Sequence, residues 1–184
     1  MATARERGTL FLVVGPSGAG KDTLIAAARA ALASDSGYVF PQRVITRSAD
    51  SGGEAHEAVS ETEFAALAAA GGFALQWSAH GLSYGIRREV QDALGAGRHV
   101  VVNVSRTVVA EARARFAPVV VVEVTADPEV LARRLAVRGR EDSAAAARRL
   151  ARAATLTVPP EARRIDNSGE LAGAAAAFVA ALRP

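Results

Sequence analysis

The segment "GPSGAGKD" (residues 15–22) constrains the fold of this 184-residue chain more than any other feature of its sequence. It follows an apolar run at residues 10–14, and the residues after it have the apolar spacing of a helix that begins near Lys21. Its glycines let backbone N–H groups turn toward phosphate oxygens, the helix N-terminus adds positive potential, and the lysine reaches the outer phosphates. The sequence therefore predicts a strand, a phosphate-binding loop and a helix, in that order.

Asp22 departs from the usual loop, because a hydroxyl that binds magnesium normally follows the lysine. A carboxylate also suits Mg²⁺ and is favoured by the helix macrodipole, but nucleotide phosphates repel it unless a cation lies between them. Asp22 is therefore a candidate metal ligand. The alternative, which the sequence leaves open, is that Asp22 caps the helix and Thr23 supplies the hydroxyl. The residues predicted to bind the nucleotide are Gly15, Pro16, Ser17, Gly18, Ala19, Gly20, Lys21, Asp22 and Thr23.

The rest of the chain predicts a single α/β domain with a parallel sheet. The runs at 99–105 and 118–125 are short, rich in valine and followed by helical patterns, as in strands buried on both faces. Ser60 and Glu63 have the spacing of a capping box, which predicts a helix from there to Gly71. The other predicted elements in the first half are a short strand at 43–46, an extended segment at 73–80 and a turn ending at Gly85. The second half is predicted to contain helices from Ile86, Asp127 and Ser143, a mobile tip at 138–142, a short edge strand or turn within 163–169 and a last helix reaching Arg183.

Composition and charge narrow the classes of partner. The formal net charge is +3, but Lys21 is the only lysine and the arginines are scattered, so nucleic-acid binding is not predicted. The absence of cysteine excludes disulfides and thiolate zinc sites. Because the first apolar run is too short for a signal peptide or a membrane span, we expect a cytoplasmic protein with no membrane partner.

Several motifs, in the same order along almost the whole chain, resemble those of the guanylate kinase family. They are "GPSGAGK", "TR" at 46–47, "GGE" at 52–54, "VSETEF" at 59–64, "HGLSYG" at 80–85 and "RRLAVRGRED" at 133–142. The resemblance implies a P-loop kinase fold, ATP as co-substrate with Mg²⁺, a small acceptor-binding region at about 43–85 and a lid at about 138–149. Lys21 would act on the transferring phosphoryl group together with the lid residues Arg138, Arg140 and Arg149.

Leu75, His56 and Asn103 stand where guanylate kinases use an acid, a tyrosine and an acid to read guanine, so GMP is not the expected acceptor. The segments "GPSGAGKD", "VITR", "HEAVSETEF", "WSAHGLSYG", "VVNVSR" and "RGRED" resemble the ribose 1,5-bisphosphate phosphokinase family. That resemblance implies phosphorylation of ribose 1,5-bisphosphate at its 1-phosphate, giving 5-phospho-α-D-ribose 1-diphosphate and ADP in phosphonate degradation.

This reaction needs no general base, because the attacking phosphate oxygen is already ionised, and it depends on positioning and charge neutralisation. Arg47 is the leading candidate for the acceptor phosphate, and Arg106 follows a strand at the sheet edge, where ligands bind in α/β proteins. Glu54 is expected either to meet sugar hydroxyls or to pair with an arginine. The complete set of substrate-binding candidates is Arg47, Glu54, His80, Tyr84, Asn103 and Arg106.

Two alternatives to this function are kept. One is a guanylate or other nucleoside monophosphate kinase, and the other is a guanylate-kinase-like module that binds proteins, although such modules can dispense with the loop lysine that this chain retains. The sequence leaves open whether the chain forms a homodimer.

Overall fold

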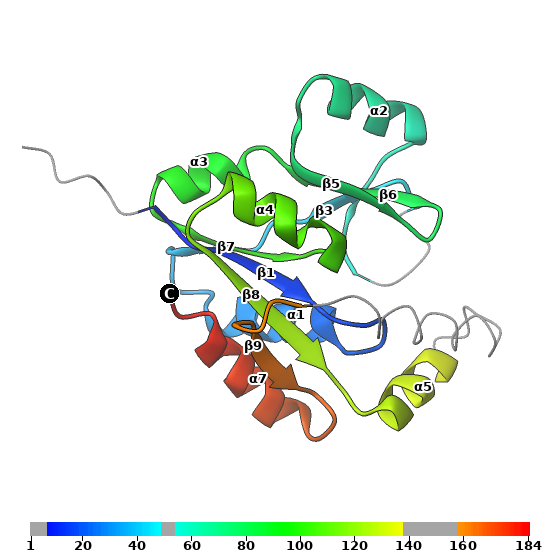
Figure 1. Cartoon of the computed structure of the whole chain (residues 1–184), viewed down its shortest axis with the longest axis vertical. Helices are drawn as coiled ribbons and strands as arrows, with labels where there is room; N and C mark the ends of the chain where they lie inside the picture. The colour runs from blue at the N-terminus through cyan, green and yellow to red at the C-terminus, as the bar shows by residue number, and fades with distance from the viewer. Residues whose placement is uncertain (1–6, 49–53, 138–157) are drawn as a thin grey trace, which may run out of the picture.

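A parallel five-stranded sheet forms the centre of the molecule (Figure 1). The computed structural model describes residues 7–48, 54–137 and 158–184. In spatial order the strands are β2 (Tyr38–Val39), β7 (His99–Asn103), β1 (Leu10–Val14), β8 (Val119–Thr125) and β9 (Arg163–Asp166). All of their pairings are parallel, so the carboxyl ends of β1, β7 and β8 meet at one edge. Of the edge strand or turn predicted within residues 163–169, the structure shows the strand, β9.

A second, smaller sheet is built entirely from residues 43–87. Its strands, in spatial order, are β4 (Glu57–Ala58), β3 (Arg43–Ile45), β6 (Leu82–Arg87) and β5 (Phe73–Ala79). The β3–β4 pair is parallel, whereas β6 runs antiparallel to both of its neighbours. This segment is the one in which the sequence predicts acceptor binding, and that role stays a prediction.

The predicted turn ending at Gly85 is wrong, and the helix predicted from Ile86 begins four residues later, at Val90. Gly85 and Ile86 lie inside β6, and the helix α3 spans Val90–Gly95. The chain instead turns at His80 and Gly81, which have φ angles of 55° and 73°, and β6 then pairs with β5. Ile86 is 1% exposed within this sheet, so tertiary burial overrides the local helical spacing.

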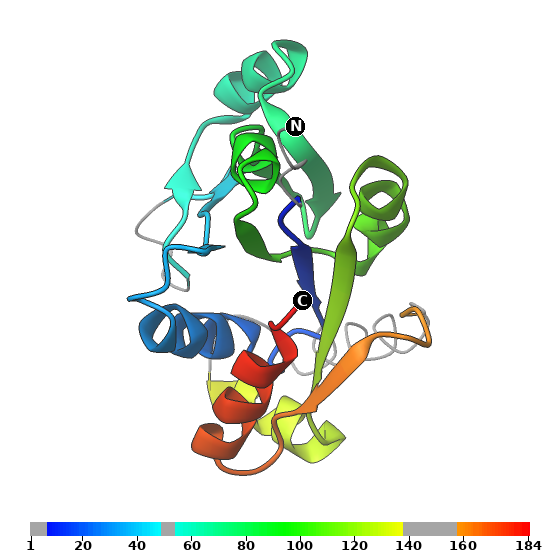
Figure 2. The ribbon, with the colours of Figure 1, turned by 90° about the vertical axis from the view of Figure 1, so that its left-hand side faces the viewer.

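Helices cover both faces of the central sheet (Figures 1 and 2). One face packs against α1 (Lys21–Ala31), α5 (Pro128–Val137) and α7 (Leu171–Ala181), and α1 and α7 lie side by side there. The other face packs against α3, the short 3₁₀ helix η2 (Arg106–Val108), α4 (Val109–Arg115) and one face of the smaller sheet. The strands are therefore buried on both faces, which confirms the predicted α/β class with a parallel sheet.

The smaller sheet carries its own helix, α2 (Glu61–Ala69), on its other face. Ser60 caps this helix as predicted: its hydroxyl accepts from the Glu63 N–H at 3.2 Å, and its own N–H donates to the Glu63 carboxylate at 2.8 Å. Phe64 of α2 packs with Val44 and Phe73 of the sheet. The predicted lid at 138–149 and the helix near Ser143 lie outside the described residues. Within the described ranges, no helix is long and apolar enough to cross a membrane.

Candidate active site

The phosphate-binding loop connects β1 to α1 and has the backbone that its glycines predict. Gly15 and Gly20 have φ angles of 147° and 89°, a region that residues with side chains rarely adopt. A Cβ at Gly15 would lie 2.1 Å from the Val124 carbonyl oxygen, and a Cβ at Gly20 would lie 2.3 Å from Nδ2 of Asn167. Both positions therefore require glycine for conformational and for steric reasons.

The ammonium of Lys21 is hydrogen-bonded to the first two residues of this loop. Its Nζ atom donates to the carbonyl oxygens of Gly15 and Pro16, at 2.9 Å in each case. The positive charge is thus held across the loop, beside the backbone N–H groups at the start of α1. This arrangement fits phosphate oxygens, because the ammonium and the helix N-terminus favour negative charge at the same place.

Asp22 lies in the first turn of α1 and is hydrogen-bonded to the end of the neighbouring strand β7. The Nδ2 atom of Asn103 donates to Oδ1 of Asp22 at 2.6 Å, and Asn103 is itself only 8% exposed. The N-cap of the helix is Gly20, with no side-chain hydrogen bond, and Asp22 lies in the first turn, so the alternative in which Asp22 is the N-cap is not observed. Thr23 is exposed. The carboxylate is therefore directed toward the strand edge at which parallel α/β sheets bind ligands.

The donors around Asp22 fit a magnesium ion only if phosphate and water complete its coordination. Magnesium is usually held by one or two carboxylates together with substrate phosphates and several waters. Among the residues that the structure describes, no group of three or more His, Cys, Asp or Glu side chains is arranged to hold a metal. Asp22, next to the phosphate-binding loop, is compatible with this shared type of site.

In the segment predicted to bind the acceptor, Arg47 and His56 contact each other through two pairs of atoms. Nη2 of Arg47 lies 3.2 Å from Nδ1 of His56, whose Nε2 lies 3.1 Å from the Arg47 carbonyl oxygen. The same Nδ1 atom lies 3.0 Å from the Glu54 carbonyl oxygen, so the His56 ring contacts the Arg47 guanidinium and two backbone carbonyl oxygens. The Nε atom of Arg47 is buried and has no hydrogen-bond partner among the described residues. His56 therefore orients the arginine that the sequence predicts to bind the acceptor phosphate.

Arg43 was not singled out from the sequence. It contacts Glu54 and Tyr84, and the three form a second cluster of interacting side chains. The Nε atom of Arg43 donates to Oε2 of Glu54 at 3.1 Å and its Nη2 atom to Oε1, so Glu54 pairs with an arginine, one of its two expected roles. The guanidinium lies over the Tyr84 ring, 5.2 Å from its centroid, and Tyr84 stacks on Trp77. Burial lowers the pKa of Arg43, the charges of Asp22 and Tyr84 raise it, and that of Arg47 lowers it. Arg43 thus lies within the electrostatic field of the loop and of Arg47.

A buried carboxylate pairs with Arg106, which begins η2 after the end of β7. Nη2 of Arg106 donates to Oε1 of Glu123 at 3.2 Å, and Nε of Arg164 donates to Oε2 at 3.3 Å. Glu123 is 9% exposed and lies beside Val14 in the parallel register, one residue before the loop. In the sequence Glu123 is one polar residue in a run of valines, and no local signal identifies its partners.

Two residues that the sequence analysis did not identify, Asn167 and Arg134, contact backbone carbonyl oxygens of the phosphate-binding loop. Asn167, which follows β9, donates from Nδ2 to the Ala19 carbonyl oxygen at 2.8 Å. Arg134 of α5 donates to the Asn167 carbonyl oxygen at 2.9 Å and approaches the Gly18 carbonyl oxygen at 3.5 Å. These contacts join the C-terminal part of the chain to the phosphate-binding loop.

The remaining predicted residues are not brought together by the described structure. His80 is exposed at the turn between β5 and β6. Arg138, Arg140 and Arg149 lie outside the described residues.

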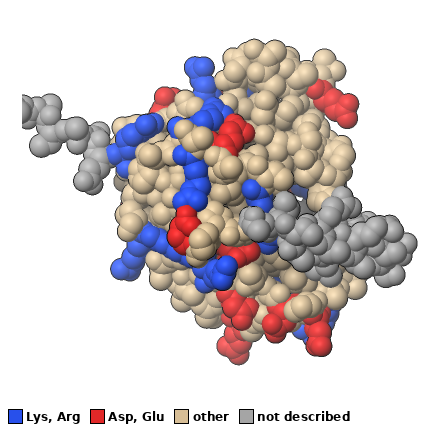
Figure 3. Space-filling model, in the orientation of Figure 1, with Lys and Arg blue, Asp and Glu red and all other residues tan. Residues whose placement is uncertain are grey.

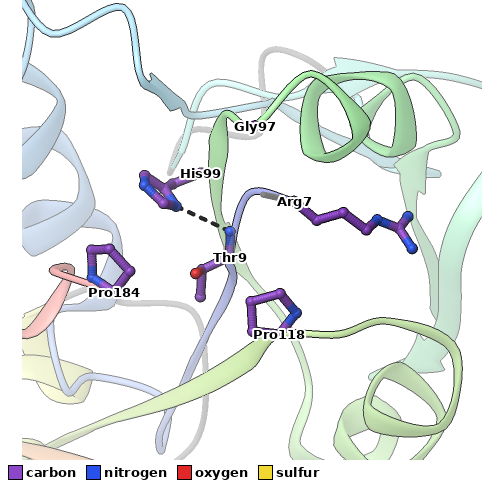
Figure 4. Close-up of a pocket in the computed structure, with 6 residues that line it drawn as sticks. All are labelled: Arg7, Thr9, Gly97, His99, Pro118 and Pro184. Atoms are coloured by element: carbon purple, nitrogen blue, oxygen red, sulfur yellow. Dashed lines mark hydrogen bonds between the residues drawn. The ribbon is translucent and has the colours of Figure 1, made fainter. Parts of the chain in front are cut away.

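At the opposite end of the central sheet, His99 accepts from the Thr9 N–H at 3.0 Å and helps to line a hollow of about 520 Å³ (Figure 4). On the face seen in Figure 3, acidic side chains lie among the basic ones.

Comparison with known proteins gives two kinds of match at the sequence level. The family described as an AAA domain matches residues 10–160. The ribose 1,5-bisphosphate phosphokinase PhnN of Acidiphilium cryptum is 56% identical over 171 residues, which cover 91% of this chain and 90% of that protein. The bifunctional ribose 1,5-bisphosphokinase-thymidine phosphorylase of Azorhizobium caulinodans is 54% identical over 153 residues. Its match covers 83% of this chain, which spans 22% of that longer protein.

Among solved structures, the guanylate kinase of Anaplasma phagocytophilum is similar to the whole fold. The TM-score is 0.68 at 19% sequence identity, and the match covers 98% of this chain and 87% of that chain. At this identity the likeness concerns the fold alone.

Proposed function

The chain belongs to the ribose 1,5-bisphosphate phosphokinase family, and from that premise we propose that it phosphorylates ribose 1,5-bisphosphate with ATP. An oxygen of the acceptor 1-phosphate attacks the γ-phosphorus of ATP, and the bond from that phosphorus to the β–γ bridging oxygen breaks. The products are 5-phospho-α-D-ribose 1-diphosphate and ADP. The observation that carries the proposal is the 56% identity to a named kinase over 90% of that protein's length.

The described residues would divide the work as follows. The loop backbone and Lys21 bind the nucleotide phosphates, and the Lys21 ammonium offsets negative charge on the transferring group. Arg47, held by His56, binds the acceptor phosphate. Arg106, which follows β7 and pairs with Glu123, would offset the charge of the second polyanion. No side chain needs to remove a proton, because the attacking oxygen is already ionised.

Magnesium would be held by Asp22 together with nucleotide phosphates and water. When bound, the ion supplies charge neutralisation between the two polyanionic reactants. Asn103 would fix the position of the Asp22 carboxylate through their 2.6 Å hydrogen bond. The lid residues Arg138, Arg140 and Arg149 would complete the site by contributing positive charge.

A guanylate kinase activity is disfavoured by the surroundings of three side chains. Leu75 is 2% exposed within the core, His56 contacts Arg47, and Asn103 contacts Asp22. The side chains at the predicted guanine-reading positions are thus either apolar or engaged within the protein. A site without partners for the guanine edge discriminates poorly in favour of guanine.

The experiment that tests the proposal is a coupled assay of ADP release with ATP and Mg²⁺, using ribose 1,5-bisphosphate and GMP as parallel acceptors. We expect turnover with ribose 1,5-bisphosphate at a kcat/KM at least about a hundredfold above that for GMP. A response to GMP with none to ribose 1,5-bisphosphate would favour the nucleotide kinase. Binding of ATP without turnover of any acceptor would favour a protein-binding module.

A further inference from the structure

The two faces of the smaller sheet have different surroundings. Side chains alternate between faces along a strand, so the directly paired residues Arg43 and Ile86 share one face with Tyr84. Ile86 packs in the same buried cluster as Leu12 of the central sheet, which places this face toward the body of the molecule. Val44 and the residues paired with it, Glu57 and Gly85, belong to the opposite face, which α2 covers.

Arg43 lies on the inner face, where it packs against an aromatic ring. Its side chain is 15% exposed, and its guanidinium lies over the ring of Tyr84. Tyr84 in turn stacks on Trp77, with ring centroids 5.4 Å apart and an angle of 4° between the planes. A guanidinium on an aromatic face keeps its planar edge of N–H donors available for a planar or tetrahedral anion. The position of Arg43 is thus fixed by packing that leaves its fork for an anionic partner.

Glu54 supplies that anionic partner within the chain itself. It accepts from both Nε and Nη2 of Arg43, and its side chain is also 15% exposed. A guanidinium this deeply buried is costly without a counter-ion, and the internal carboxylate therefore stabilises it. A phosphate offers the same two-point geometry with more negative charge, and it can therefore replace the carboxylate.

The location of the pair connects it to the reaction. Among the charges that shift the pKa of Arg43 are those of Asp22, in the first turn after the phosphate-binding loop, and Arg47, the leading candidate for the acceptor phosphate. Contacts also link the pair to Arg47, because the Glu54 carbonyl oxygen lies 3.0 Å from Nδ1 of His56, which lies 3.2 Å from Nη2 of Arg47. A dianionic phosphate placed between Arg43 and Arg47 would relieve the repulsion between the two guanidinium groups.

We propose that Arg43 is a ligand of the acceptor phosphate and that Glu54 is its resident counter-ion, which gives up the guanidinium fork when the acceptor binds. The inference rests on the proposed function, because it assigns a residue within the same site. Under this proposal, the Arg43–Glu54 ion pair contributes to selectivity for phosphorylated acceptors. Acceptors that carry phosphate displace Glu54, whereas uncharged sugars leave the ion pair closed.

The test compares steady-state constants for Arg43→Gln, Glu54→Gln and the double variant. Losing a charge-assisted, two-point contact should raise the KM for ribose 1,5-bisphosphate about 10- to 100-fold, with the KM for ATP within about twofold of wild type. Glu54→Gln should lower the acceptor KM, because a neutral amide competes less well for the guanidinium. In the Arg43→Gln background, Glu54→Gln should have no such effect.

Arg87→Gln is the matched control. Arg87 pairs with Glu57 through the same two nitrogen atoms, but the pair lies on the opposite face of the same sheet and is more exposed, at 31% and 41%. The Arg87→Gln substitution should leave the KM for ribose 1,5-bisphosphate and the KM for ATP unchanged. Thermal unfolding of each variant shows whether the protein is folded, and Arg43→Lys, which keeps the charge but loses the fork, should give an intermediate acceptor KM.

An unchanged acceptor KM in folded Arg43→Gln, or equal changes in the two KM values, would overturn the assignment. A rise in the acceptor KM for Glu54→Gln would instead make Glu54 a direct substrate ligand. If the wild-type protein uses GMP and not ribose 1,5-bisphosphate, the proposed function fails, but the same comparison with GMP still tests Arg43. If no phosphorylated acceptor is turned over, both proposals are contradicted.

Discussion

The side-chain amide of Asn103 donates a 2.6 Å hydrogen bond to Oδ1 of Asp22, joining the end of β7 to the first turn of α1. The two residues are 81 positions apart in the chain, and the parallel register that places Asn103 beside Val13 brings them together. An amide in this place can orient the carboxylate without adding a second negative charge. The pair thus gives Asp22 a defined position next to the phosphate-binding loop, as a metal ligand requires.

Replacing Asp22 with Asn should weaken the response to magnesium. The substitution removes the negative charge that would hold the ion, so the Mg²⁺ concentration for half-maximal turnover should rise at least about tenfold. A titration of ADP release against Mg²⁺ at saturating ATP measures the effect. Asp92→Asn, on the exposed surface of α3, is the control and should behave as wild type. Equal magnesium curves for the wild-type protein and Asp22→Asn would remove Asp22 from the metal site.

Replacing Asn103 with Ala should produce a smaller form of the same defect. The carboxylate would remain but lose its fixed orientation, and loss of such an outer contact typically weakens metal binding by about 10- to 100-fold. Excess Mg²⁺ should therefore restore most of the turnover of Asn103→Ala. A loss of kcat that no magnesium concentration restores would mean that Asn103 acts on the substrate directly.

Lys21→Arg should lose activity although it keeps the positive charge. The Lys21 ammonium lies between two carbonyl oxygens at 2.9 Å each, a space that suits a compact group better than a planar guanidinium. Loss of one well-placed donor to the transferring group typically lowers kcat by about 10²- to 10³-fold. Steady-state kinetics together with far-UV circular dichroism separates this loss from unfolding. A kcat within about threefold of wild type would contradict the assigned role.

Gly20→Ala should destabilise the fold as well as the site. The new methyl group would meet Asn167 at 2.3 Å in a backbone with φ of 89°, and strain of this kind costs about 1–3 kcal/mol. Urea unfolding followed by the fluorescence of Trp77 measures the change. Gly173→Ala is the matched control, because a Cβ in that part of α7 meets nothing within 4 Å and alanine favours the helix by about 0.5–1 kcal/mol. Opposite signs for the two substitutions are expected; equal signs would contradict the packing argument.

The sequence predicted the elements whose signals are local. The valine-rich runs of β7 and β8, the glycines of the loop and the capping box at Ser60 and Glu63 all correspond to observed structure. The α/β class is confirmed, and so is the membership of the kinase family that the ordered motifs indicated. These features depend on spacing within one segment or on the order of segments along the chain.

The features that the sequence did not predict depend on contacts between distant segments. Strand β6 was mistaken for a turn and a helix because its pairing with β5 and β3 is not encoded in its own spacing. Glu123 and Asn167 act on Arg106 and Ala19 across gaps of 17 and 148 residues. Arg43 acquires its surroundings only when Tyr84 is brought beside it by β6. These polar contacts join residues that are distant in the sequence, so they become visible only in the folded structure.

The most direct test of the central claim is ³¹P NMR of the reaction of the protein with ATP, Mg²⁺ and ribose 1,5-bisphosphate. The account predicts that the signal of the 1-phosphate disappears and a pair of coupled diphosphate signals replaces it. The 5-phosphate signal should persist while ADP accumulates in equal amount. A bisphosphate spectrum that stays unchanged while GMP is converted to GDP, or a new diphosphate at position 5, would contradict the account.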